Sequence, residues 1–192
     1  MKRYVLAITG ASGSIFGIRL LEELAKAEEV HLIISSQSFS IIKEETGIDL
    51  SGDTQEKVRE RFSSERIFFH PNTALHAPVA SGSFKTEGML VVPCSMKTLS
   101  GISHGYSQSL IERTADVTIK EGRPLILSPR ETPLSALHLE NMLRLARLGV
   151  RIVPPMAAFY HQPHTLEEMV DFVAGKILDS LGLENSLFRR WE

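Results

Sequence analysis

The sequence predicts an α/β protein with a Rossmann-like three-layer fold, in which a parallel sheet carries helices on both faces. Apolar, β-branched runs alternate along the chain with segments of helical periodicity, an order typical of parallel sheets. The apolar runs are continuous, as expected for strands covered on both faces. The 192 residues suffice for one sizeable core. Since no linker or repeat divides them, we expect a single domain over residues 1–192.

The elements follow in order along the chain. Six runs are typical of strands, at residues 3–9, 30–35, 66–69, 88–93, 124–128 and 150–154. Five segments are typical of helices, at residues 14–26, 38–47, 53–62, 132–149 and 165–182. Two glycine- and serine-rich spans carry no strong signal, at residues 70–87 and 99–118. Long irregular stretches in a compact domain are usually functional or lie at an interface.

Capping residues set several helix limits. Gly47 is expected to end the second helix, because glycine adopts the left-handed conformation that stops a helix. Asp53 and Glu56 form a capping-box pattern at the start of the third helix. Thr132 is the expected N-cap of the fourth, with Pro133 at its first helical position.

Composition excludes several classes of partner. The net charge of −2 provides no broad basic field for nucleic acid or anionic lipid. Cys94 is the single cysteine, so no intrachain disulfide forms, as suits a reducing compartment. The apolar stretch after Lys2 and Arg3 is too short for a signal peptide, and no run approaches the ~18 apolar residues of a membrane span. We expect a cytoplasmic protein.

The turn after the first strand is the first candidate site. It reads Gly10-Ala11-Ser12-Gly13-Ser14 and matches neither the dinucleotide fingerprint nor the P-loop. Glycines let backbone amides approach an anion, and the following helix N-terminus adds partial positive charge. The turn is either a mononucleotide-phosphate site or simply a tight turn.

Other strand ends carry polar residues at the edge where ligands bind in open α/β sheets. The second strand ends at Ser35, and the fourth is followed by Ser95-Met96-Lys97-Thr98, which either binds a ligand or caps a helix. The fifth is followed by Arg130 and Glu131, which form either part of a site or a surface ion pair.

Other reactive residue types fit no catalytic pattern. Cys94 follows a strand, but a small buried thiol explains it better than a nucleophile. His161 and His164 lack the further ligands of a metal site, so we expect no metal. No G-x-S-x-G follows any strand, which argues against a Ser-His-Asp hydrolase. Lys176 borders an apolar helix face, where a snorkelling side chain is the plainer explanation.

Five sequence blocks carry a resemblance to a known family. They read "TGASGSIFGIRLL", "PVASGSFKTEGMLVVPCSMKTLSGI", "LIERTADVTIKEGRPLILSPRETP", "FYHQP" and the terminal "RRW". In this order, from about residue 4 to 191, they resemble the UbiX-type flavin prenyltransferases. The resemblance is weakest over 47–75.

The resemblance implies a metal-independent transferase in a Rossmann-like fold. Such an enzyme joins the dimethylallyl group of dimethylallyl monophosphate to reduced FMN. The product, prenylated FMN, serves a UbiD-type decarboxylase partner in ubiquinone or aromatic-acid metabolism. The family assembles as a homododecamer that binds FMN between subunits.

The family's functional residues carry over to positions of this sequence. The implied FMN-binding residues are Gly10, Ala11, Ser12, Ser35, Ser95, Met96, Lys97, Thr98 and Arg113. The residues implied to hold the prenyl donor or lie near the flavin ring are Ser81, Gly82, Ser83, Lys120, Arg130, Tyr160, Lys176 and Trp191. Those implied in the chemistry are Glu45, Ser12, Lys120, Arg130 and Glu131. Some relatives have an arginine in place of Lys176. An arginine can hold a phosphate with two parallel hydrogen bonds, which a lysine cannot.

Two other functions remain open at this point. The first is a flavin-dependent cysteine-type decarboxylase of the same fold, which carries a similar "ASGS" element and uses a histidine after an early strand. His31 instead begins a strand here. The second is a flavin carrier or NAD-binding module without catalysis, for which the cations at the strand ends would be incidental.

Overall fold

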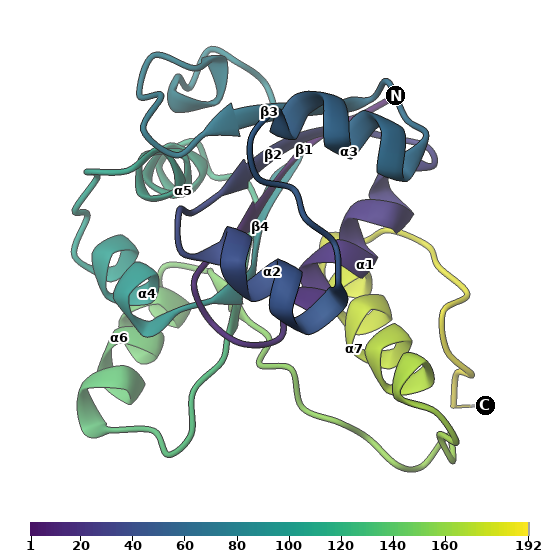
Figure 1. Ribbon diagram of the computed structural model, residues 1–192. Coiled ribbons are helices and arrows are strands. Elements are labelled where there is room, and N and C mark those ends of the chain that lie inside the picture. Colours follow the sequence, from purple (N-terminus) through teal and green to yellow (C-terminus); the bar gives the residue numbers. More distant parts are fainter. Residues whose placement is uncertain (192) are drawn as a thin grey trace.

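Six parallel strands form one sheet in the computed structural model, which describes residues 1–191 (Figure 1). They are β1 (Arg3–Ile8), β2 (Glu29–Ile34), β3 (Ile67–Pro71), β4 (Gly88–Cys94), β5 (Leu125–Pro129) and β6 (Arg151–Ile152). Their order in the sheet is β3-β2-β1-β4-β5-β6. From β1 the chain adds β2 and β3 on one side, and it then returns to place β4, β5 and β6 on the other side of β1. The switch point of the sheet therefore lies between β1 and β4. Ligands of such folds bind outside the carboxyl ends of the strands at this switch point.

Helices cover both faces of the sheet. One apolar core lies between the sheet and α1 (Ser14–Ala25), α2 (Ser38–Thr46), α3 (Thr54–Phe62) and α7 (Leu166–Leu181). The other lies beneath the short 3-10 helix η1 (Pro78–Ala80), α4 (Met96–Ser103), α5 (Leu110–Lys120) and α6 (Ala136–Arg147). The predicted three-layer fold is confirmed. Within residues 1–191, no helix has the length and hydropathy that crossing a membrane requires.

The continuous apolar runs behave as predicted because each strand supplies both cores. In β1, Tyr4, Leu6 and Ile8 face the first core, whereas Val5 and Ala7 face the second. All five are buried. A strand buried on one side only would need alternating polar residues.

Two predicted helix ends are confirmed. Gly47 ends α2 in the left-handed conformation, with φ of 74°. The Asp53 side chain caps α3 by accepting a hydrogen bond from the backbone N–H of Glu56 at 3.1 Å.

Several predicted limits are wrong. The helix expected over 132–149 begins only at Ala136, because Ser135 and His138 form a reciprocal capping box one turn later than Thr132. The strand expected over 150–154 is reduced to Arg151–Ile152. The span 99–118 contains most of α4 and α5. The start of α5 had a readable signal, since Ser109 and Glu112 form a capping box.

Gly17 allows α1 to approach the sheet closely. A Cβ at this position would lie 2.4 Å from the carbonyl oxygen of Val92 and 3.0 Å from the side chain of Ile8. The glycine therefore sets how near the turn after β1 lies to the end of β4.

We expect Gly17→Ala to lower the free energy of unfolding by about 2–4 kcal/mol, because the contacted oxygen belongs to rigid backbone. Gly149→Ala is a suitable control. It has a φ of +84° with no atom within 4 Å of its Cβ, so only left-handed strain of about 1 kcal/mol is expected. Urea unfolding measures both. Equal losses in the two variants would contradict the close-approach argument.

Candidate active site

The turn after β1 already holds an anion from within the chain. The Glu45 carboxylate, at the end of α2, accepts hydrogen bonds from the backbone N–H of Gly13 at 3.0 Å and of Ser14 at 2.8 Å. The Ser14 hydroxyl donates a third bond at 2.7 Å. The helix N-terminus thus attracts negative charge as predicted, but the charge it meets is a side chain of α2.

Hydrogen bonding dominates the ionisation of Glu45. Burial by itself raises the pKa of this carboxyl, but hydrogen bonds from the hydroxyls of Ser12 and Ser14 and from the amides of Ser14 and Gly13 outweigh it. The pKa therefore lies below its usual value of 4.5. Glu45 is a carboxylate at neutral pH, and the same bonds make it a weaker base.

Thr9 joins the ends of the two switch-point strands. Its hydroxyl donates to the carbonyl oxygen of Pro93 at 2.8 Å and accepts from the backbone N–H of Ser95 at 2.8 Å. Ser95 then caps α4, because its hydroxyl accepts from the backbone N–H of Thr98 at 3.3 Å. The capping function considered for Ser95 is confirmed. Its binding function stays a prediction.

Two substitutions separate these roles of Ser95. We expect Ser95→Ala to lose the cap, about 1 kcal/mol of stability, and affinity for FMN. Ser95→Asp retains an N-cap of similar quality but places a negative charge beside the expected phosphate. It should therefore stay as stable as wild type and bind FMN more weakly. Thermal unfolding and flavin fluorescence titration measure the two effects. FMN affinity unchanged in both variants would remove Ser95 from the binding site.

Other predicted residues lie at the same edge of the sheet. The Ser35 hydroxyl, at the end of β2, pairs with that of Ser38 at 2.7 Å. Arg130 is exposed just after β5 and hydrogen-bonds through its backbone N–H to the carbonyl oxygen of Cys94 at 3.2 Å. The Glu131 carboxylate accepts from the backbone N–H of Thr132 at 3.0 Å, so no Arg130–Glu131 ion pair forms.

This strand-end cluster fits a mononucleotide phosphate. We define it by the residues it gathers, which are Gly10–Ser14, Ser35, Glu45, Ser95–Thr98 and Arg130. Gly10 leaves little room for a side chain, because a Cβ there would lie 3.2 Å from the Cβ of Gln37. With the Gly13 and Ser14 amides occupied by Glu45, the phosphate is left to the Gly10–Ser12 backbone and the neighbouring hydroxyls. Glycine and hydroxyl donors at a switch point suit a mononucleotide phosphate.

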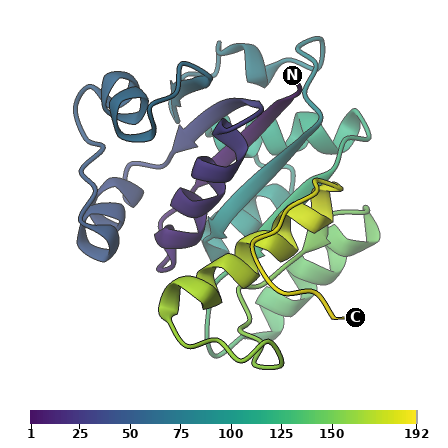
Figure 2. The ribbon, with the colours of Figure 1, turned by 90° about the vertical axis from the view of Figure 1, so that its right-hand side faces the viewer.

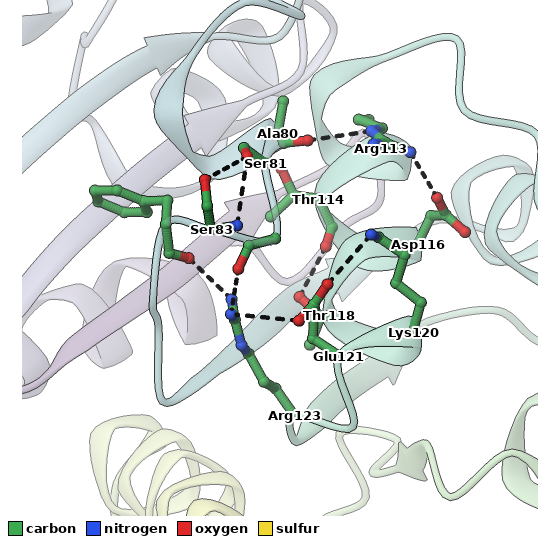
Figure 3. Close-up of polar contacts among 12 residues, drawn as sticks. Ala80, Ser81, Ser83, Arg113, Thr114, Asp116, Thr118, Lys120, Glu121 and Arg123 are labelled. Carbon is green, nitrogen blue, oxygen red and sulfur yellow. Dashed lines mark hydrogen bonds and ion pairs between the residues drawn. The ribbon is translucent and has the colours of Figure 1, made fainter.

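A second group lies along α5 (Figure 3). Arg113 donates to the carbonyl oxygen of Ala80 at 3.2 Å and pairs with Asp116 at 2.8 Å. One to three residues beyond Ala80, the hydroxyls of Ser81 and Ser83 hydrogen-bond to each other at 2.9 Å. This α5 cluster consists of Ser81–Ser83, Arg113 and Lys120.

Arg123 holds the loop of the α5 cluster and Glu121 lies against it, and neither residue was predicted from the sequence. Arg123 donates to the carbonyl oxygens of Gly82 at 2.6 Å and Phe84 at 2.9 Å (Figure 3). A Cβ on Gly82 would lie 2.2 Å from Glu121 Oε1, which explains the glycine. Lys120 pairs with the same carboxylate at 3.2 Å. No local pattern marks Arg123, because its partners Gly82 and Phe84 lie some forty positions earlier.

Aromatic side chains form a third group near the C-terminus. Tyr160 meets Trp191 edge to face, with ring centroids 5.5 Å apart, and meets Phe172 of α7 at 5.7 Å. Tyr160, Trp191 and their neighbours line a cavity of about 230 Å³, completed by His161, Gln162, Arg189 and Arg190. Lys176 lies one helical turn beyond Phe172 and approaches Asp179 at 3.9 Å. Tyr160 and Trp191 are thus in contact, and their assignment to the prenyl donor stays a prediction.

A single chain does not bring together the residues predicted to hold the prenyl phosphate. We call these residues the phosphate cluster; they are Lys120, Arg130, Tyr160 and Lys176. Lys120 ends α5, just before β5 begins, whereas Arg130 follows directly where β5 ends. The two cations therefore lie at opposite ends of that strand. Tyr160 and Lys176 lie with α7 on the opposite face of the sheet from Lys120.

Two other predictions concern Cys94 and the histidines. Cys94 is fully buried, and burial raises the pKa of its thiol far above the usual range, so the buried-thiol interpretation is confirmed. Among residues 1–191, no three His, Cys, Asp or Glu side chains are grouped to hold a metal ion. Metal independence stays a prediction.

The class of this protein follows from its similarity to known proteins. The family model described as Flavoprotein matches residues 1–178. Flavin prenyltransferase UbiX of Alkalihalophilus pseudofirmus is 47% identical over 194 residues, covering 99% of this chain and 96% of the relative. UbiX of Methanocaldococcus jannaschii is 47% identical over 189 residues, covering 98% of each. The chain belongs to the UbiX flavin prenyltransferases within the flavoprotein family.

A solved structure agrees with this assignment. A crystal structure of AnUbiX (PadA1) in complex with FMN and dimethylallyl pyrophosphate matches with a TM-score of 0.91 and 43% identity, over 100% of this chain and 97% of that one. The cysteine-type decarboxylase alternative has only distant support. TvaF, an FMN-dependent cysteine decarboxylase from thioviridamide biosynthesis, matches at 14% identity with a TM-score of 0.62, over 95% and 98% of the chains. That likeness shows the shared fold alone.

Proposed function

We propose that this flavin prenyltransferase joins the dimethylallyl group of dimethylallyl phosphate to reduced FMN. The observation that carries the proposal is the cavity beside Tyr160 and Trp191, which combines aromatic walls with the guanidinium group of Arg189. Aromatic faces suit an allyl group that gains positive character, and cations suit its phosphate. Prenylated FMN is the proposed product, and a UbiD-type decarboxylase the proposed recipient.

FMN binding is assigned to the strand-end cluster. The Gly10–Ser12 backbone and the hydroxyls of Ser35, Ser95 and Thr98 would hold its phosphate. When bound, reduced FMN supplies the electron-rich ring that takes the dimethylallyl group. Ser81–Ser83 of the α5 cluster are proposed to lie near that ring.

Cations stabilise the leaving phosphate. Breaking the C–O bond leaves negative charge on the phosphate, and positive groups aimed at that charge lower the barrier. Lys120, Arg130 and Lys176 supply the charge, and the Tyr160 hydroxyl donates a hydrogen bond. Glu131 lies beside Arg130 and is proposed to orient it. The aromatic walls keep water from the allyl group.

We further propose that the site is completed between copies of the chain. Lys120 and Arg130 lie at opposite ends of β5, and Arg113 is turned toward Ala80 instead of Gly10. A second copy that presents its α5 cluster to the strand-end cluster unites them. A related FMN-dependent UbiX-like decarboxylase of Escherichia coli O157:H7 is dodecameric, with 44% identity, a TM-score of 0.90 and 99% of each chain covered. This similarity supports a homododecamer for the present chain.

Proton removal is assigned to Glu45 and Ser12. Closing a new ring on the flavin releases a proton, which a carboxylate can accept. Hydrogen bonds at the α1 N-terminus keep Glu45 ionised, the form that accepts a proton. The Ser12 hydroxyl is proposed to relay the proton to it.

Two broader statements belong to the same proposal. The whole chain acts as one flavoprotein domain, which the single sheet running from β1 to β6 supports. A cytoplasmic location is consistent with a buried Cys94 thiol that has no disulfide partner.

Anaerobic incubation with reduced FMN and dimethylallyl phosphate, followed by mass analysis of the extracted flavin, tests the function. A gain equal to one five-carbon prenyl unit is expected. An unchanged flavin mass with folded protein contradicts the proposal. Calorimetry of FMN-saturated protein with dimethylallyl phosphate then tests the carrier alternative, which predicts no binding.

A further inference from the structure

The segment that follows α7 turns back and runs beside that helix to the C-terminus (Figure 2). We call residues 183–191 the C-terminal strap. Its first anchor is Asn185, whose side-chain amide donates to the carbonyl oxygen of Gly175 at 3.2 Å and to Asp179 Oδ1 at 2.9 Å. The strap is thereby attached to the middle of α7.

Gly175 provides a seat for the second anchor. The Phe188 ring lies where a side chain at residue 175 would be, since a Cβ there would come within 2.5 Å of it. Phe188 also meets Phe172 at 5.0 Å between ring centroids. Glycine lowers the stability of a helix interior. A glycine at this position of α7 is explained by the close approach of the strap.

Asp179 is the third anchor, and two cations lie close enough to pair with its carboxylate. It receives both terminal nitrogens of Arg190, at 2.8 and 3.0 Å, a bidentate pairing of the strong kind. Lys176 lies one turn earlier on α7, with its Nζ 3.9 Å from the same carboxylate. The Asp179 side chain is 23% exposed, so its charge is only partly screened by water. Asp179 therefore faces two cations, of which Arg190 holds both its oxygens.

The neighbour of Arg190 in sequence is Trp191. Its ring meets Tyr160 edge to face at 5.5 Å, forming one wall of the cavity of about 230 Å³. Fixing Arg190 on α7 thus fixes the position of Trp191. Because Arg190 occupies both oxygens of Asp179, it also determines how strongly Asp179 can neutralise the charge of Lys176.

We propose that Arg190 is a positioning residue for the phosphate-bearing prenyl donor. It pairs with both oxygens of Asp179, and so holds Trp191 against Tyr160 and leaves Lys176 free for the phosphate. This inference rests on the proposed function, because it takes Tyr160 and Lys176 to bind the donor. It adds that Asp179, when Arg190 does not pair with it, competes with the substrate phosphate for Lys176.

The competition for Lys176 predicts different KM values among four variants, which a simple loss of packing would not distinguish. In Arg190→Ala, the strap loosens and Asp179 turns to Lys176, so the KM for dimethylallyl phosphate should rise about fivefold to tenfold. Asp179→Asn also frees the strap but carries no competing charge, so a rise of about twofold is expected. The double variant should return to the level of Asp179→Asn. Arg190→Lys keeps the charge but not the fork, and should rescue part of the loss.

Kinetics with reduced FMN, at varied dimethylallyl phosphate, measure these effects. FMN affinity should stay at the wild-type level in all variants. Ser186→Ala is the matched control, because Ser186 is an exposed residue of the same strap. A double variant as poor as Arg190→Ala, or equal KM values for Arg190→Ala and Ser186→Ala, would overturn the proposal.

A second readout does not depend on turnover. Trp191 is the single tryptophan of the chain, so the fluorescence anisotropy of the FMN-free, full-length protein reports the motion of the strap. Anisotropy should fall in Arg190→Ala and Asp179→Asn and stay unchanged in Ser186→Ala. This result is expected even if the flavin is not prenylated, so failure of the proposed function is distinguishable. An anisotropy unchanged in Arg190→Ala shows that Arg190 does not hold the strap.

Discussion

Replacing Lys120 or Arg130 with alanine is expected to lower prenyl transfer by about a hundredfold or more, because each removes a cation from the leaving phosphate. FMN should still bind, since the hydroxyls and backbone amides of the strand-end cluster remain. Single-turnover assays with reduced FMN measure the rate, and flavin titration measures binding. Arg61→Ala, an exposed change on α3, is the control and should retain full activity.

Mixing the two inactive variants tests the proposed completion of the site between copies. If Arg130 of one copy acts with Lys120 of another, random co-assembly of equal amounts restores about a quarter of the sites. Activity should then rise from near zero toward that fraction after the variants are dissociated and reassembled together. Mixtures that stay inactive, although they form normal oligomers, place both cations in the same copy. Normal turnover in either single variant would remove that residue from the phosphate cluster.

The strand-end cluster was predictable because its parts follow strands directly. Gly10–Ser14, Ser35 and Ser95–Thr98 each come straight after an apolar run, and parallel strands bring their carboxyl ends to one edge. No strand order was needed to place them together. The order β3-β2-β1-β4-β5-β6 adds that the turns after β1 and β4 are neighbours, which the Thr9 hydroxyl bridges to the Pro93 carbonyl and the Ser95 amide.

The remainder depends on contacts that local pattern does not encode. The resemblance groups Lys120 with Arg130, yet the chain places them at opposite ends of β5, so their distance is set by the path of the backbone. The capture of Glu45 by the α1 N-terminus joins residues some thirty positions apart. Asp179 and Arg190 look like ordinary surface charges until the strap is seen against α7.

Glu45→Gln is expected to lower turnover by about a hundredfold or more, because an amide cannot take the proton that the flavin loses. Gln retains an oxygen that can accept from the Gly13 and Ser14 amides, so the fold and FMN binding should survive. Glu44→Gln, the neighbouring exposed change on α2, is the control. Rapid-mixing kinetics with preformed reduced-FMN complex isolate the chemical step from binding.

The pH dependence gives a second test of Glu45 with a defined sign. Its pKa in the folded chain lies below the usual 4.5, so the carboxylate form predominates at and above that pH. Its contribution to stability and to turnover is therefore present above the unfolded pKa and lost as pH falls through the lower folded pKa. Wild type should lose both in that acidic window, whereas Glu45→Gln should show a flatter stability profile there. Wild-type turnover in Glu45→Gln, together with reduced stability, would instead mean that the carboxylate only satisfies the exposed amides of α1. The relay assigned to Ser12 would then have no acceptor, and the proton would have to leave the flavin by another route.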